Sequence, residues 1–147
     1  MASDREHTRD LDGRDIIGEA MIDRVVRRFY DCARRDDMLG PVFAAHVVDW
    51  EPHLSRMCAF WSALMLGTRN YRGRPMQMHT PLPIDARHFE RWLDLFEASA
   101  AEICPPAAAA QFTAHARRIG QSLELGIAGS RGLILNTGER LPALEGS

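Results

Sequence analysis

The chain has 147 residues, of which 46% are hydrophobic and 26% charged, the composition of one globular domain and not of a disordered chain. Its formal net charge of -2 gives no overall basic field, so we expect neither nucleic acid nor an anionic membrane surface as a partner. No apolar run approaches the roughly 20 residues that span a bilayer, and the polar N-terminal residues do not form a secretory signal, so we expect a cytoplasmic protein.

The first predicted helix lies between residues 15 and 35. Apolar residues recur at helical spacing in its second half, at Ile22, Val25, Val26, Phe29, Tyr30 and Ala33. We expect this helix to end near Asp36. The next residues, Leu39-Gly40-Pro41, are predicted to form a turn, because glycine frees the backbone and proline disfavours helix at the residue before it.

A second helix is predicted to begin after Asp49, a good N-cap residue, and to end at Gly67. Helical spacing gives it one mainly apolar face, formed by His53, Met57, Phe60, Trp61 and Leu64. Residues 68–83 contain three prolines and are predicted as a loop, in which Pro75 can open a short helix that reaches His79.

Two more amphipathic helices follow. The first is expected from Ile84 to Cys104, with Asp85 as its cap, and its apolar face carries Phe89, Trp92, Leu93 and Phe96. Pro105-Pro106 should close it. The last helix is expected from about Pro106 to Leu125, and its apolar residues are Phe112, Ile119 and Leu123. Gly126 and Gly129 are expected to release the chain after it.

No alternating strand pattern and no internal repeat is visible, so the predicted class is all-α. We expect one domain over residues 15–127, with tails at 1–14 and 128–147. In the second tail, Leu133-Ile134-Leu135 is apolar enough to dock on the domain or on a partner. The three cysteines are widely spaced and form no C-x-x-C pair, so they indicate neither a disulfide framework nor a zinc site.

Polar side chains interrupt the apolar faces of these helices. Tyr30, His53 and Trp92 each lie on such a face, and His79 lies in the loop between the second and third long helices. A buried polar group needs a partner, and each residue taken singly has an ordinary one, such as a backbone carbonyl. Taken together they suit a heme pocket, which needs an imidazole on one face of the ring, apolar walls, and donors over the other face.

At these residues the sequence resembles the truncated hemoglobins, and within them the third group, small globins with a two-over-two helical sandwich around a heme. Four ordered segments carry the resemblance, and it covers roughly residues 15–127. The segments are FYDCARRDDMLGPVF at 29–43, WEPHLSRMCAFWSALMLG at 50–67, YRGRPMQMHTPLP at 71–83 and HFERWLDLF at 88–96.

The resemblance implies a role for one or more residues of each segment. His79 corresponds to the proximal histidine, the protein ligand to the iron. Tyr30, His53 and Trp92 correspond to the residues that face the bound ligand, together with Met57, which stands where a branched aliphatic residue is more usual. Phe43, Phe60 and Trp61 correspond to heme-packing positions.

Other residues complete the expected heme-binding set. Arg56, Tyr71 and Arg74 flank the pocket and could bind the heme propionates, because arginine pairs well with carboxylates. Met76 and Phe89 are expected to contact the heme from the loop and the third long helix. The sequence contains no C-x-x-C-H motif, so the expected cofactor is non-covalent heme b.

The expected function is reversible binding of dioxygen, with carbon monoxide and nitric oxide as further ligands. Nitric oxide dioxygenase or peroxidase chemistry at the same heme is the alternative, since one set of donors suits both, and it would need a reductase that the sequence does not name. We expect a monomer or weak dimer. A cofactor-free helical interaction module is the alternative from another class, whereas a di-iron bundle would need Glu-x-x-His ligands that are absent.

Overall fold

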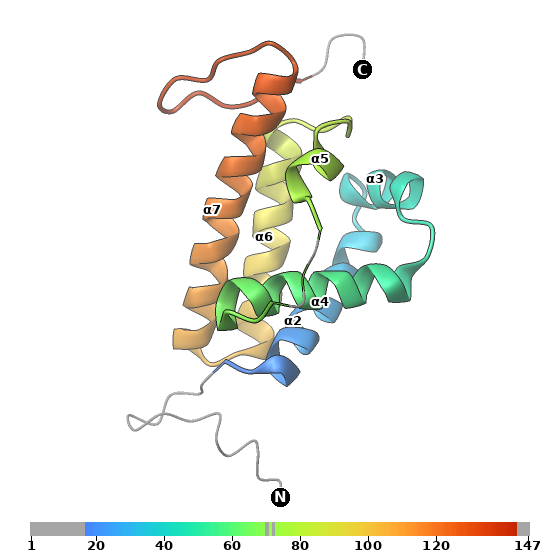
Figure 1. Ribbon diagram of the computed structural model, residues 1–147, viewed down its shortest axis with the longest axis vertical. Coiled ribbons are helices and arrows are strands. Elements are labelled where there is room, and N and C mark those ends of the chain that lie inside the picture. The colour runs from blue at the N-terminus through green and yellow to red at the C-terminus, as the bar shows by residue number, and fades with distance from the viewer. Residues whose placement is uncertain (1–16, 70, 72, 144–147) are drawn as a thin grey trace, which may run out of the picture.

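The computed structural model describes residues 17–69, 71 and 73–143, and every regular element in those residues is a helix. These helices are α2 (Glu19–Arg34), α3 (Leu39–His46), α4 (Trp50–Leu66), α5 (Pro75–His79), α6 (Ala86–Ile103) and α7 (Pro106–Ser130). Figure 1 shows α6 and α7 side by side, with α4 crossing them and the short α3 and α5 at one end. Because α2 packs on both α4 and α6, it joins the two helix pairs of an all-α sandwich, and the predicted class is confirmed.

The first helix buries the stripe that its spacing predicts. All six predicted residues of α2 are buried, from Ile22 to Ala33. Its start differs, because α2 begins at Glu19 and not near residue 15. A helix of this length gains most of its stability from packing an apolar face, so this stripe is the reason that α2 lies where it does.

The predicted turn at Leu39-Gly40-Pro41 is wrong, since these residues form the first turn of α3. Proline is tolerated in a first turn, where its missing N–H would have no helical partner. The Asp36 carboxylate accepts hydrogen bonds from the N–H groups of Met38 and Leu39, both at 3.0 Å, and so supports the helix start. A side chain at Gly40 would overlap the Arg34 carbonyl, so glycine allows α3 to approach the end of α2.

The ends of α4 and α6 follow the sequence signals. Asp49 is the N-cap residue of α4, and Gly67 ends the helix in the left-handed region at φ 76°. Asp85 caps α6, because its carboxylate accepts the Arg87 N–H at 2.8 Å. Leu64, expected on the apolar face of α4, is instead exposed.

The last helix is longer than predicted. Gly126 and Gly129 do not release the chain, because α7 continues to Ser130 and buries Ile127 and Ala128. Glycine lowers helix propensity by about 1 kcal/mol relative to alanine, which burial of neighbouring apolar residues can offset. Beyond α7, residues 131–143 have no regular structure, but Leu141 among them is buried.

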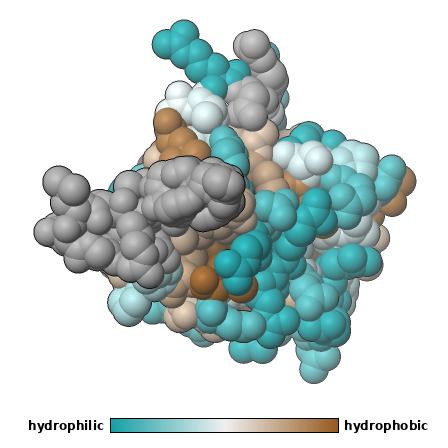
Figure 2. Space-filling view, turned by 90° about the horizontal axis from the view of Figure 1, so that it is seen from below, coloured by the Kyte–Doolittle hydropathy of each residue, from teal (hydrophilic) through white to brown (hydrophobic). Residues whose placement is uncertain are grey.

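Buried residues fall into two clusters. The larger joins α2, α4, α6 and α7 and is rich in aromatic rings, including Phe29, Trp61, Phe96 and Phe112. The smaller is mainly aliphatic and joins the end of α7 to Ile84, Phe89 and Leu141, with Met76 packed against it. No helix among the described residues is long and apolar enough to cross a membrane. Seen from below in Figure 2, apolar atoms show only as small patches on a largely hydrophilic surface.

Candidate heme and ligand-binding site

His79 is the last residue of α5, a five-residue helix that Pro75 opens. The His79 Nδ1 atom lies 2.7 Å from the Pro75 carbonyl oxygen. A carbonyl oxygen can only accept, so Nδ1 carries the proton and donates it. The neutral imidazole then has its lone pair on Nε2, which is the tautomer a metal-binding histidine needs.

Three aromatic side chains from α3 and α4 meet around Tyr30 of α2. Its ring centroid lies 5.1 Å from that of His53, 5.3 Å from Phe43 and 5.7 Å from Trp50. Trp50 also lies 5.4 Å from His53. Tyr30 is buried, which raises the pKa of its hydroxyl and keeps it protonated as a hydrogen-bond donor. The structure therefore brings together Tyr30, Phe43 and His53, three of the predicted residues.

His53 carries the clearest unsatisfied group of this region. Its Nε2 atom is buried and has no hydrogen-bond partner among the described residues. Burial lowers the pKa of His53, and the charge of Arg56 lowers it further.

Trp92 lies beside this group and is half-buried on α6. Its ring stacks on Phe96 at 5.7 Å and makes an edge contact with Phe29 at 6.1 Å. Phe96 in turn stacks on Trp61 at 4.7 Å. Since Phe29 also contacts Tyr30 at 4.8 Å, one continuous set of rings places both predicted donors, Tyr30 and Trp92.

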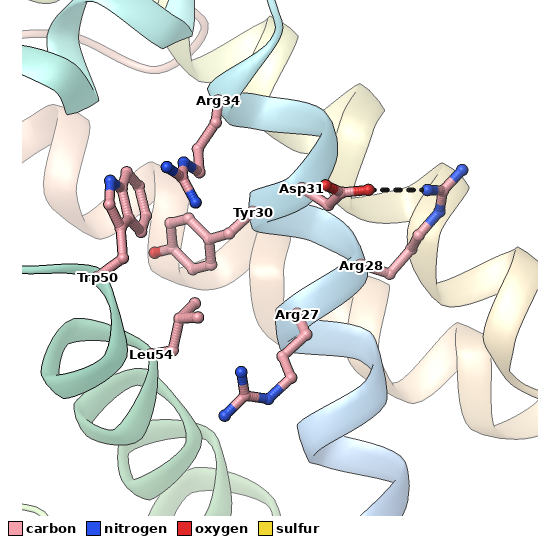
Figure 3. A pocket seen from close by; sticks show the side chains of 7 residues that line it. All are labelled: Arg27, Arg28, Tyr30, Asp31, Arg34, Trp50 and Leu54. Atoms are coloured by element: carbon pink, nitrogen blue, oxygen red, sulfur yellow. Dashed lines mark hydrogen bonds and ion pairs between the residues drawn. The ribbon is translucent and has the colours of Figure 1, made fainter.

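A pocket of about 400 Å³ lies between α2 and the start of α4, and Tyr30 is part of its lining (Figure 3). Tyr30 reaches from α2 toward Trp50 and Leu54, and the Arg34 guanidinium lies over the Trp50 ring, 4.3 Å from its centroid. The pocket lining includes Tyr30 but neither His53 nor His79. It is therefore a separate hollow that reaches the predicted site only at Tyr30.

The remaining predicted residues lie at the edges of the same region. Phe60 contacts Tyr71 at 5.3 Å and Trp61 at 5.7 Å. Burial raises the pKa of Tyr71, while the charge of Arg56 opposes this shift. Arg56 and Arg74 are both exposed.

Three apolar members of the predicted set lie in the two clusters. Met57 is half-buried and packs against the larger cluster. Phe89 is 8% exposed within the smaller cluster, and Met76 packs on that same cluster. Phe89 and Met76 therefore lie in the smaller cluster, on the His79 side of the predicted site. Met57 lies in the larger cluster, with the aromatic rings of Tyr30 and Trp92.

Trp50 is a member of the ring group that the sequence analysis did not single out. It contacts Tyr30, Phe43 and His53. Its position three residues before His53 could have identified it, because residues three apart lie on the same side of a helix.

The bacterial-like globin family matches residues 14–117 of this chain. The chain belongs to this family. A group 3 truncated hemoglobin of Campylobacter jejuni is 34% identical over 88 residues, which make up 56% of this chain and 69% of that protein. The predicted resemblance to group three truncated hemoglobins is confirmed.

Solved structures agree with this membership. The crystal structure of the Campylobacter jejuni group III truncated hemoglobin matches with a TM-score of 0.69 and 29% identity, over 73% of this chain and 88% of that one. A hemoglobin from Chloroflexus aurantiacus matches with a TM-score of 0.63 and 28% identity, over 72% of this chain and 90% of that one. The protein is thus a truncated hemoglobin, a member of a family of heme proteins that bind small gaseous ligands.

The residues of this truncated hemoglobin fit a heme. The His53 Nε2 atom is buried without a partner among the described residues, and a buried polar atom of this kind needs one. His79 offers an imidazole whose Nδ1 is already bonded to a carbonyl. The rings of Tyr30 and Trp50 lie against His53, and the thioethers of Met57 and Met76 pack on the two apolar clusters, which suits an apolar macrocycle.

Proposed function

We propose that this truncated hemoglobin binds one non-covalent heme b through His79 and uses it to bind dioxygen reversibly. The observation that carries the proposal is the hydrogen bonding of two imidazoles. One, His79, is oriented by its Nδ1 bond at 2.7 Å, and the other, His53, has a buried and unpartnered Nε2. When bound, heme supplies an iron that accepts a nitrogen ligand on one face and a diatomic ligand on the other.

The chain's own residues divide into three tasks in this proposal. His79 holds the iron, and its bond to the Pro75 carbonyl fixes the orientation of the ring. The proposed walls of the heme pocket are Phe43, Met57, Phe60, Trp61, Met76 and Phe89. The proposed partners of the heme propionates are Arg56, Tyr71 and Arg74, of which both arginines are exposed and free to reach a carboxylate.

Tyr30, His53 and Trp92 face the diatomic ligand in the proposal. The Tyr30 hydroxyl and the Trp92 indole N–H donate to a ligand that carries negative charge, and Met57 borders it. Such donors act strongly in a site that excludes water. His53 lies one turn after the start of α4, where its side chain can move between solvent and the site. We propose that it controls the entry of the diatomic ligand.

Replacing His79 by alanine tests the cofactor assignment. The variant should lose most of its heme and the ferrous spectrum of an imidazole-bound iron. His46→Ala is a matched control, because His46 also ends a helix and its Nδ1 also lies 2.8 Å from the carbonyl oxygen four residues earlier, but it is exposed. If His79→Ala keeps full heme content and an unchanged spectrum, another residue holds the iron or none does.

A second measurement separates oxygen binding from oxygen chemistry. The same donors suit nitric oxide dioxygenase or peroxidase activity, so that activity is the alternative function. A reversible oxygen-binding curve without consumption of nitric oxide or peroxide supports the first function. Sustained consumption in the presence of a reductase supports the second. The proposal includes a cytoplasmic monomer or weak dimer, which carbon monoxide and nitric oxide also bind.

A further inference from the structure

The segment that follows α7 folds back onto the loop that follows His79. The Arg131 Nη2 atom donates to the carbonyl oxygens of Leu82 and Ile84, at 3.0 and 2.9 Å. The Leu82 N–H donates to the His79 carbonyl oxygen at 3.0 Å. Two successive hydrogen bonds therefore connect the Arg131 guanidinium to the backbone of His79.

The same segment is anchored at a second point. Leu141 is 2% exposed, its carbonyl accepts the Ala86 N–H at 3.0 Å, and its own N–H donates to the Glu124 carboxylate at 2.7 Å. The Arg140 guanidinium donates to the same carboxylate at 2.8 Å. The bonds to Glu124 are charge-assisted and attach residues 131–143 to α7, and the backbone bond from Ala86 attaches them to the start of α6.

The helix that carries His79, α5, is weakly anchored by its own residues. No residue of α5 is buried, and a helix of five residues is unstable alone. Its contact with α7 includes Met76, whose thioether occupies the space that a side chain at Gly126 would fill. The position of His79 therefore depends on elements outside α5.

We propose that residues 131–143 act as a clamp that sets the position of His79, with Arg131 as its main positioning residue. The proposal rests on the function proposed above, in which His79 holds the iron. The clamp lies beyond residue 117, where the match to the family ends. Outer partners of a metal-binding histidine control its orientation, and a shift of the loop at Leu82 would move the imidazole relative to the iron.

The geometry of Arg131 favours a mechanical role over charge pairing. Both bonds to the loop come from one nitrogen and go to neutral carbonyl oxygens. The other terminal nitrogen, Nη1, is buried without a partner among the described residues. Lysine, which has a single terminal nitrogen with three donors, can replace both bonds without leaving a second buried nitrogen.

The test compares Arg131→Met, Arg131→Lys and the parent as heme-loaded full chains. Resonance Raman spectra of the ferrous proteins report the iron–histidine stretching band, and transfer to an acceptor apoprotein reports heme loss. In Arg131→Met the band should shift and broaden, and heme should leave about tenfold faster, which corresponds to about 1.4 kcal/mol. Arg131→Lys should restore most of both properties.

Arg117→Met is the matched control. Arg117 lies on α7 and pairs with Glu97 at 3.6 Å, but its side chain is 56% exposed. This variant should match the parent in both readouts. If Arg131→Met does not fold, Arg140→Met, whose side chain is 45% exposed, should give a smaller shift in the same direction.

The two proposals fail in different ways. If the parent shows no iron–histidine band, or if His79→Ala keeps it, the proposed function is wrong. If the parent shows the band and a folded Arg131→Met has the same band and the same heme loss as Arg117→Met, the clamp is refuted. A lower melting temperature with an unchanged band also refutes it, because the role of Arg131 would then be structural only.

Discussion

The two sides of the proposed site are held in different ways. On the side of Tyr30 and Trp92, side chains rise from long helices and are placed by a large aromatic cluster that includes Phe29 and Phe96. On the side of His79, the residue lies on a short helix with no buried residue, next to a smaller aliphatic cluster.

This difference assigns separate physical tasks to the two clusters. Ring packing fixes the proposed ligand donors, since close-packed side chains in a core have little freedom to move. Hydrogen bonds from a distant part of the chain fix the proposed iron ligand. The side of Tyr30 and Trp92 should therefore be sensitive to substitutions that remove side-chain volume. The side of His79 should be sensitive to substitutions that remove individual polar contacts.

Phe96→Ala should give the largest effect on stability. Phe96 is 1% exposed and stacks on both Trp61 and Trp92. Removing a buried phenylalanine side chain should lower the free energy of unfolding by about 3 to 5 kcal/mol, measured by urea denaturation. Leu125→Ala, at a residue 54% exposed on α7, is the control and should stay within about 0.5 kcal/mol of the parent. Equal losses in both variants would contradict the assignment of the core.

Tyr30→Phe and Trp92→Phe should speed oxygen dissociation. Each removes a donor to a negatively charged ligand, a contact that contributes about 1.5 to 3 kcal/mol, so dissociation should be about tenfold faster or more. Carbon monoxide is less polar when bound, so its dissociation should change less and serves as the internal control. The double variant should not be the sum of the singles. Stopped-flow rates equal to the parent in all three variants would show that neither residue donates to the ligand.

Asp85 should make the proximal side sensitive to acid. The bond from the Arg87 guanidinium, followed by the Arg87 N–H and the charge of His88, lowers the pKa of this carboxyl to about 2 from 3.8, although burial opposes the shift. A lowered pKa in the folded state stabilises the protein above pH 3.8, and this contribution is lost as pH falls toward about 2.

Asp85→Asn should remove that part of the pH dependence. The free energy of unfolding is measured by urea denaturation between about pH 5 and pH 2, and the parent should lose more of it than the variant. Asp94→Asn, at an exposed residue of the same helix, should keep the dependence of the parent. If the free energy of unfolding of Asp85→Asn falls with pH as steeply as that of the parent, this carboxyl does not make the protein sensitive to acid.

His53→Leu should have the smallest effect, a change of a few-fold in the association rates of oxygen and carbon monoxide. In the proposal His53 controls entry, and gating by one side chain changes access more than affinity. His46→Leu, at an exposed histidine of α3, should leave both rates unchanged. Equal association rates in His53→Leu and the parent, measured by flash photolysis, would contradict a gating role.

Much of the larger cluster could be predicted from the sequence, because the helical spacing of apolar residues is enough to place their side chains on one face of a helix. The stripe of α2 and the capping of α6 by Asp85 are local properties, and both are confirmed. Four segments of family-like sequence also indicated the fold. The roles of Tyr30, His53, Trp92 and His79 stay predictions, since the structure places these residues but does not show their ligands.

The errors occurred where the signal of one residue was opposed by contacts that its neighbours make. Pro41 signals a turn by itself, but Asp36 caps a helix start just before it. Gly126 signals a helix end, but α7 continues because its next residues, Ile127 and Ala128, are buried. Neither contact can be read from the residues at the position itself.

The sequence by itself determined the helical class, the apolar faces and the family, because these depend on residue period and on short motifs. Only the tertiary structure decided how the segment of Arg131 and Leu141 lies, because one buried leucine in a polar stretch has no period. It also decided the link from Arg131 to the loop after His79, about 50 positions earlier in the chain. Such a link exists only once α7 has packed on α6, since that packing brings the two segments within hydrogen-bond distance.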